Sequence, residues 1–258
     1  MLLLLAALLF CDDPQHAECV PLRESGRDWL VRAQSYMTSD PETVEELTAD
    51  DMTVLEGDLV LSTDRNAVNN RWPTSSIPYA IDATLEGRTN DIEAAMAMVS
   101  EETCLTFHLR TSEPDYLLFQ TSKGCASYVG FIGGKQPVFV GPQCRVGNII
   151  HEILHAAGFH HEHTRQDREK FISIQTGNIM QGMEKNFNKR SGATFELPYD
   201  ITSILHYGSH FFSVNGQPTI VPNESVKGMG QRRKMTPLDV AKVRQLYKCD
   251  PAEADGSR

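Results

Sequence analysis

The stretch HEILHAAGFHHEHTRQDRE, residues 151–169, contains five histidines, three glutamates and one aspartate, all side chains that can bind metal ions. His151 and His155 are four residues apart, so on a helix both imidazoles project from one face and can bind the same ion. Gly158 can adopt the left-handed backbone conformation that ends a helix, which turns the chain and brings His161 to that ion. Three neutral imidazoles with an open fourth position are typical of a catalytic zinc site.

The residue that follows the first histidine suits the same chemistry. Glu152 is placed to accept a proton from a water molecule that the metal activates. The short pattern HExxH arises by chance in about one chain in a hundred, and the added matches at Gly158 and His161 make chance about a thousandfold less frequent. His160 and His163 lie outside this spacing, and we expect polar, partly exposed side chains there. The sequence therefore predicts one zinc ion per chain at a hydrolytic site.

The formal net charge of −10 is confined to the first quarter of the 258 residues. Residues 1–65 contain 4 basic and 14 acidic side chains, whereas residues 66–258 contain 20 of each. The larger part of the chain therefore has neither a basic stripe for nucleic acid nor an overall charge that would steer a charged partner.

The chain begins MLLLLAALLFC, and its nine consecutive apolar residues suit the core of a signal peptide but are too few to span a bilayer. A buried N-terminal helix is the alternative. We expect a secreted, extracellular protein without stable membrane insertion, and storage in secretory granules fits the same route. The sequon that begins at Asn223 is a candidate glycosylation site.

Apolar spacing predicts a helix over residues 90–102, a second over 146–157 that carries the metal-binding histidines, and a third from Thr236 onward. Alternating apolar residues and glycines predict strands between residues 104 and 144. A sheet, then the metal-binding helix, then a loop-rich tail with one helix is an α+β arrangement.

The extended histidine motif resembles that of the astacin family of zinc endopeptidases, which belongs to the metzincins. The family signature HExxHxxGFxHExxRxDR is matched at every fixed position from His151 to Arg168. Further segments resemble the start of the family's mature domain (WPTSSIPY), its substrate-edge strand region (GCASYVGFIGGKQPVFVGPQC) and its Met-turn (SILHYG). The resemblance implies a two-lobed fold: a twisted, mostly parallel sheet with long helices in the N-terminal lobe, and an irregular C-terminal lobe with one terminal helix.

The resemblance also implies roles for single residues. The three histidines of the motif would bind zinc, and Glu152 would be the general base. Tyr207 would be an extra ligand that swings away to stabilise the oxyanion of the tetrahedral intermediate, and a phenol can indeed donate a hydrogen bond where negative charge develops. The family's methionine in the Met-turn is Leu205 here. This exchange roughly conserves volume, so we expect a working site.

The acidic first quarter resembles a propeptide. VLEGDLVL resembles the family's F-x-G-D latch, with Leu55 at the aromatic position, and Asp58 would bind the zinc through its carboxylate. An ordinary Gly-Asp turn is the alternative. A rival latch is Cys19 in ECVPLR, which is similar to the cysteine switch of another metzincin family but lies far from the expected cut.

A trypsin-like protease would cut after Arg65 and free Asn66 as the mature N-terminus. The resemblance implies that this terminus is buried near Glu162, the glutamate that follows the third histidine. An ammonium group that meets a buried carboxylate would order the substrate cleft after activation. The resulting organisation is a signal peptide over residues 1–11, an acidic propeptide over 12–65, a catalytic domain over 66–250 and a short tail over 251–258.

Four of the six cysteines follow residue 66, an even number that in a secreted chain favours two disulfides. Zinc binding by these thiols is disfavoured because no C-x-x-C spacing occurs. Their spacing leaves three pairings open, and the resemblance selects Cys104–Cys249 and Cys125–Cys144. Cys19 has no assigned partner.

The expected protein is a monomeric, secreted zymogen of a zinc endopeptidase that hydrolyses peptide bonds in proteins or peptides. Substrate would lie extended along an edge strand near residues 130–134 and pair through its backbone. One alternative is another metzincin with a different latch, which the continuation GFHHEHTRQDR disfavours. The other is a catalytically inactive binding protein on the same fold, which the intact set of ligands and base disfavours.

Overall fold

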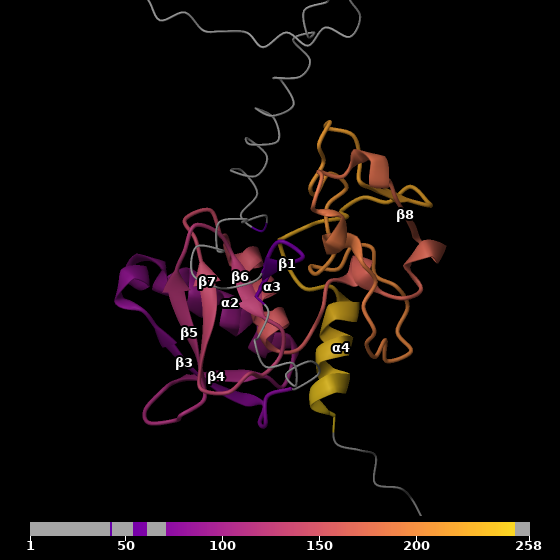
Figure 1. Ribbon diagram of the computed structural model, residues 1–258. Helices are drawn as coiled ribbons and strands as arrows, with labels where there is room; N and C mark the ends of the chain where they lie inside the picture. Colours follow the sequence, from indigo (N-terminus) through magenta and orange to yellow (C-terminus); the bar gives the residue numbers. More distant parts are fainter. Residues whose placement is uncertain (1–41, 43–53, 61–70, 251–258) are drawn as a thin grey trace, which may run out of the picture.

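The computed structural model describes residue 42, residues 54–60 and residues 71–250 (Figure 1). The predicted signal peptide, Cys19, the cleavage site between Arg65 and Asn66, and residues 251–258 lie outside the described residues. The described chain forms a lobe built on a large sheet and a second, loop-rich lobe that contains β8 and β9 and ends in helix α4. The predicted α+β class is confirmed.

The large sheet has seven strands in the order β1-β2-β6-β7-β5-β3-β4. The strands are β1 (Val54–Leu55), β2 (Leu59–Val60), β3 (Ser76–Ile81), β4 (Thr106–Leu109), β5 (Tyr116–Thr121), β6 (Ala126–Tyr128) and β7 (Lys135–Val140). Four neighbouring pairs are parallel, and only β1–β2 and β6–β7 are antiparallel. Parallel neighbours need a crossover, which the 3₁₀-helix η3 (Ala83–Arg88) and α2 (Thr89–Glu102) supply between β3 and β4.

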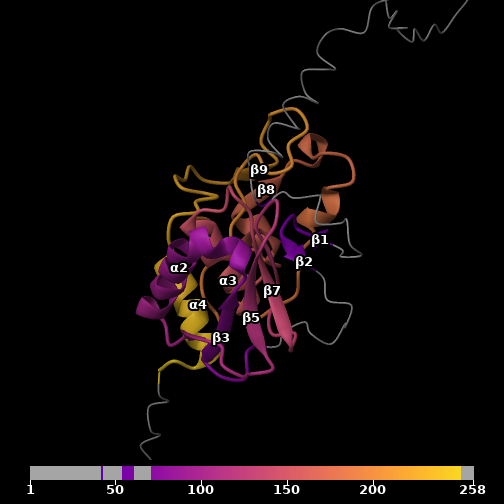
Figure 2. The same cartoon turned by 90° about the vertical axis from the view of Figure 1, so that its left-hand side faces the viewer.

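Helices α2 and α3 (Val146–Ala156) pack side by side against the large sheet (Figure 2). Helix α2 buries Ile92, Ala95, Met96 and Val99, the apolar face that the sequence predicts. Helix α3 is buried on all sides from residue 147 to residue 156, as expected for a helix enclosed by the sheet and the loop-rich lobe. The metal-binding motif therefore lies on the most enclosed helix of the described chain.

The loop-rich lobe contains little regular structure, as predicted. Its elements are the antiparallel pair β8 (Ile172–Ile174) and β9 (Ile220–Pro222), and the 3₁₀-helices η4 (Glu162–Thr164), η5 (Arg168–Lys170), η6 (Thr176–Asn178) and η7 (Glu184–Phe187). The terminal helix α4 (Pro237–Tyr247) begins where predicted, with the Thr236 side chain accepting a hydrogen bond from the Asp239 amide and proline at the first helical position.

Two disulfides join the pairs that the resemblance implies. Cys104–Cys249 links the end of α2 to the end of α4 and spans 145 residues, and Cys125–Cys144 spans 19 residues. In the chain-entropy model a crosslink stabilises more when it closes a longer loop. The first disulfide therefore contributes more to the unfolding free energy.

We expect the variant C104S/C249S to lose about 5 kcal/mol of unfolding free energy and C125S/C144S to lose about 3 kcal/mol, by the loop-length dependence of crosslinking. Denaturant unfolding of both variants and the wild type under one oxidising condition measures the difference. Equal losses, or a larger loss from the short loop, would contradict this account.

Candidate active site

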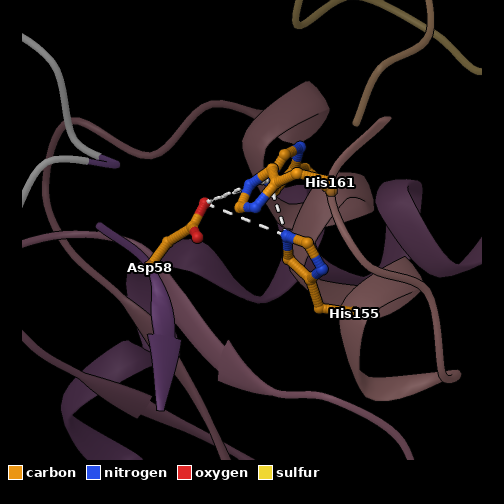
Figure 3. Close-up of side chains that lie close together, drawn as sticks. Asp58, His155 and His161 are labelled. Atoms are coloured by element: carbon orange, nitrogen blue, oxygen red, sulfur yellow. Dashed lines mark hydrogen bonds and ion pairs between the residues drawn. The ribbon is translucent and has the colours of Figure 1, made fainter. Parts of the chain in front are cut away.

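Three imidazoles converge between α3 and the loop that follows it, facing Asp58 (Figure 3). His151 and His155 project from one face of α3, and Gly158, with a φ of 116°, turns the chain so that His161 faces them. The Nε2 atoms of His151 and His155 are 2.9 Å apart, and those of His151 and His161 are 3.2 Å apart. The structure therefore brings together the three histidines that the spacing predicts.

A hydrogen bond at the outer nitrogen fixes each ring. The two histidines of α3 donate from Nδ1 to backbone carbonyls, the first to Ile204 at 2.7 Å and the second to Phe159 at 2.6 Å. The Nδ1 atom of His161 lies 2.8 Å from a carboxylate oxygen of Glu56. Because these oxygens can only accept, we assign the proton of each ring to Nδ1. Each Nε2 then presents a lone pair towards the other two rings.

The carboxylate of Asp58 completes the cluster. One of its oxygens lies 3.0 Å from Nε2 of His151, 3.2 Å from Nε2 of His161 and 3.9 Å from Nε2 of His155. Four electron-rich atoms at these distances repel one another unless they share a cation. Tetrahedral zinc with Zn–N bonds of about 2.0–2.1 Å places neighbouring ligand atoms about 3.3 Å apart, in agreement with these distances. The residues present therefore fit zinc.

Glu152 is fully buried beside this cluster, and among the described residues neither of its carboxylate oxygens has a hydrogen-bond partner. Burial and the charges of Asp58 and Glu42 raise the pKa of Glu152 well above its usual range. Asp58 shows the opposite shift: burial opposes its ionisation, but a proton on His161, the cation whose place a metal ion would take, and hydrogen bonds from His151 and His161 hold its pKa well below the usual range. Two neighbouring carboxylates with opposite shifts have different roles in the site.

Tyr207 packs against the histidines. Its ring centroid lies 4.7 Å from that of His161, and it stacks on His163 at 3.8 Å. Its hydroxyl donates a hydrogen bond to the backbone carbonyl of Glu56, and burial raises the pKa of Tyr207, so the phenol is protonated. The expectation that His163 is partly exposed is wrong. Its side chain is fully buried because it packs on Tyr207 and hydrogen-bonds the carbonyl of Asn186 at 3.0 Å.

The Met-turn lies next to the N-terminus of α4. The carboxylate of Asp239 accepts hydrogen bonds from the Ser203 hydroxyl and, at 2.9 Å, from the amide of Ile204, whose carbonyl fixes His151. Leu205 is buried in the core that α3 shares, at the position where the resemblance expects methionine. Asp239 therefore caps α4 and also orients the Met-turn, whose Ile204 carbonyl fixes the ring of His151.

Residues 54–60, which we call the latch segment, occupy the site. Gly57 has a φ of 77°, and a Cβ there would lie 2.5 Å from the carbonyl oxygen of Glu42, so the turn before Asp58 accepts only glycine. Strand β2 pairs in parallel with β6, and the amide of Ser127 donates to the carbonyl of Asp58 at 2.9 Å. The edge of β6 (Ala126–Tyr128) is therefore covered by the chain itself.

The predicted edge strand near residues 130–134 needs correction. Residues 130–134 are not a strand, because Gly130, Gly133 and Gly134 all have positive φ angles, and the amide of Gly130 donates to the carbonyl of His155. The strand that pairs with the latch segment is β6, residues 126–128.

Glu42 is a part of the site that sequence reasoning missed. Its carboxylate accepts hydrogen bonds from Nε of Arg232 at 2.6 Å and 2.8 Å, from Nη2 of Arg232 at 2.5 Å and from the side chain of Asn148 at 2.6 Å. It also lies close to His151 and Glu152, with their ligand atoms all within 4.8 Å of one another. It lies outside every motif described above, so no signal in the sequence identified it.

Glu162 lies where α4 meets the loop after the third histidine. One carboxylate oxygen accepts from Nζ of Lys242 at 2.6 Å, and the other accepts from the amide of Asp200 at 2.8 Å and from Arg165 at 3.1 Å. A cavity of about 500 Å³ adjoins it, lined also by Arg71, Gly158 and residues 190–195. Glu162 therefore has protein partners before any new terminus reaches it.

The candidate glycosylation site lies on the surface of the described part of the chain. Asn223 is exposed, as a glycosylated asparagine must be, and its side-chain amide donates to the carbonyl of Glu169 at 3.0 Å. Within the described ranges, no helix is both long and apolar enough to cross a membrane.

Comparisons with known proteins agree with this geometry. Zinc metalloproteinase nas-4 of Caenorhabditis elegans is 37% identical over 235 residues, which cover 81% of this chain and 75% of that protein. Low choriolytic enzyme of Oryzias latipes is 37% identical over 212 residues, 76% of this chain and 78% of that protein.

Among solved structures, high choriolytic enzyme 1, a hatching-enzyme zinc protease from Oryzias latipes, superposes with a TM-score of 0.67. It is 32% identical and covers 75% of this chain and all of that one. The family profile of the peptidase family Astacin matches residues 64–248. The chain therefore belongs to the astacin family and is a zinc metalloendopeptidase.

Proposed function

We propose that the chain is a secreted, monomeric zymogen in which Asp58 blocks the zinc site and a trypsin-like cut after Arg65 removes the block. The observation that carries the proposal is the Asp58 carboxylate, one oxygen of which lies within 3.0–3.9 Å of the Nε2 atoms of all three histidines. Zinc held by the three histidines would leave one position open for water and substrate, and the Asp58 carboxylate would occupy it. The apolar N-terminal segment and the two disulfides support secretion.

Zinc held by the three histidines would polarise the scissile carbonyl and lower the pKa of a water molecule. Glu152, buried beside the ligands with both oxygens unpaired among the described residues, would accept the proton of the attacking water and pass it to the leaving nitrogen. The carboxylates of Asp58 and Glu42 would leave with the propeptide. The pKa of Glu152 would then fall, so that its carboxylate is more readily ionised and can accept a proton.

Removal of the latch segment would also free two groups that act on substrate. The Tyr207 hydroxyl would lose its acceptor, the carbonyl of Glu56, and become able to donate to the oxyanion of the tetrahedral intermediate. Strand β6 would lose β2 and offer its edge to an extended peptide. Protein and peptide substrates are therefore bound mainly through their backbone.

The new N-terminus at Asn66 would enter the cavity beside Glu162. The ammonium group would join two cations, Lys242 and Arg165, that already neutralise this carboxylate. Its arrival therefore requires Lys242 to share or give up an oxygen of Glu162. Activation would rearrange an existing ion-pair network rather than satisfy an isolated charge.

We expect the wild type, once cut after Arg65 and loaded with zinc, to hydrolyse a quenched protein substrate. Activity of this sample also tests whether Leu205 supports a working site. The variant E152Q should have a kcat lower by about 10²–10⁴-fold, the usual contribution of a general base, with the same zinc content. The control E101Q changes an exposed glutamate of α2 and should match the wild type. An undiminished rate in E152Q would exclude Glu152 as the base.

We expect uncut D58A to show part of the activity of the cut wild type, because loss of the carboxylate opens the position beside the three histidines and weakens the hold of the latch segment on β6 and Tyr207. Hydrolysis by the uncut variant is compared with that by uncut wild type, and the double variant D58A/E152Q shows whether the activity belongs to this chain. An uncut D58A that stays as inactive as the wild type would rule out Asp58 as the latch.

We expect an alanine inserted between Arg65 and Asn66 to lower the melting temperature of the cut protein, because the ammonium group then misses Glu162. A charge-assisted hydrogen bond contributes about 1.5–3 kcal/mol, and each kcal/mol shifts the melting temperature of a domain this size by about 2–4 °C. In the E162Q background the insertion should have a much smaller effect. Equal melting temperatures with and without the insertion, in the presence of Glu162, would contradict the buried terminus.

A further inference from the structure

We propose that Glu56 is a positioning residue of the metal site. Its carboxylate accepts the hydrogen bond from Nδ1–H of His161, orients that ring and so raises the zinc affinity of the uncut chain. The inference rests on the proposed zinc site and on the proposed loss of the residues before Asn66. A carboxylate oxygen of Glu56 lies 2.8 Å from Nδ1 of His161, and both side chains are buried. Cutting the chain would therefore remove a part of the metal site that is not itself a ligand.

The three histidines differ in what fixes them. The two on α3 donate to the carbonyls of Ile204 and Phe159, which lie in the catalytic domain and remain after cleavage. His161 donates to a carboxylate that belongs to the latch segment. A charged acceptor makes a stronger hydrogen bond than a neutral carbonyl and makes the imidazole a better ligand. Of the three rings, His161 therefore has the strongest outer partner, and that partner leaves with the propeptide.

The position of Glu56 is fixed on every side. Its second carboxylate oxygen accepts from Nε of Arg190 at 2.8 Å, and its amide donates to the side chain of Asn186 at 2.9 Å. Its carbonyl accepts from the hydroxyl of Tyr207. The two backbone contacts hold Glu56 beside His161, and Arg190 adds an ion pair at the carboxylate oxygen that does not contact the ring. The arrangement is the carboxylate–histidine pair that orients metal ligands in proteins.

The ion pair with Arg190 offers a different explanation, in which Glu56 only anchors the latch segment. The two roles separate because Arg190 contacts one oxygen of Glu56 and His161 contacts the other. Removing Arg190 weakens the anchor but leaves the hydrogen bond to His161 in place. Replacing Glu56 by glutamine keeps its size and removes the charge that His161 meets.

The experiment measures zinc affinity of the full, uncut chain by competition with a chromophoric chelator. Loss of an outer partner of a metal-binding histidine typically weakens metal binding about 10–100-fold, so we expect E56Q to bind zinc about tenfold more weakly. E56D, whose carboxylate is one methylene shorter, should show a loss of the same size. The matched control R190Q should stay within twofold of the wild type. The visible spectrum of bound cobalt(II), which reports the ligand set, should be the same in E56Q and wild type.

Wild type and E56Q become the same protein after the cut at Arg65, so their zinc affinities should converge. An affinity of uncut E56Q within twofold of the wild type would overturn the inference, as would equal losses in E56Q and R190Q, a changed cobalt spectrum, or a difference that survives the cut. The variant H161A tests the zinc site separately. If H161A binds zinc as tightly as the wild type, the proposed site fails; if H161A loses zinc and E56Q does not, only the role of Glu56 fails.

Discussion

The site depends on hydrogen bonds that lie outside it. Three Nε2 lone pairs and one carboxylate face the same position, an arrangement that only a shared cation stabilises. The rings keep this orientation because each Nδ1 donates to a fixed acceptor: Ile204, Phe159 or Glu56. These acceptors come from the Met-turn, the loop after α3 and the latch segment. The orientation of the three metal-binding rings therefore depends on three separate parts of the chain and not on α3 alone.

The fold keeps these parts in register. Helix α3 is enclosed by the sheet lobe, so its imidazoles cannot move without disturbing the core. Asp239 joins the start of α4 to the Met-turn, and the Cys104–Cys249 disulfide joins the end of α4 to α2. Lys242 connects α4 to Glu162, beside the third ligand. Helix α4 therefore fixes the loops around the zinc site relative to the sheet lobe.

Apolar periodicity predicted α2, α3 and α4, and the spacing of the histidines predicted the site, because both depend only on local helical geometry. Burial of charge was not predictable in this way. Helix α4 was predicted from its apolar residues, yet the structure also buries Asp239 and Lys242, because Asp239 accepts hydrogen bonds from the Met-turn and Lys242 pairs with Glu162. Glu42 and His163 were missed for the same reason. A buried polar residue is recognised by its tertiary partners, and a single sequence does not name those.

The proposed inhibition by the latch segment would rest on several modest contacts. It is held by a carboxylate at the histidines, by two residues of parallel strand pairing and by the ion pair of Glu56, and Glu42 makes a separate ion pair with Arg232. Each contact is of limited strength, but a tethered segment meets its site at an effective concentration of about a millimolar or more. In the proposed zymogen, a cut after Arg65 would leave the same contacts but end the tether, so the segment would dissociate on dilution. Inhibition would therefore depend on the connection along the chain as much as on Asp58, and hydrolysis of one peptide bond would release it.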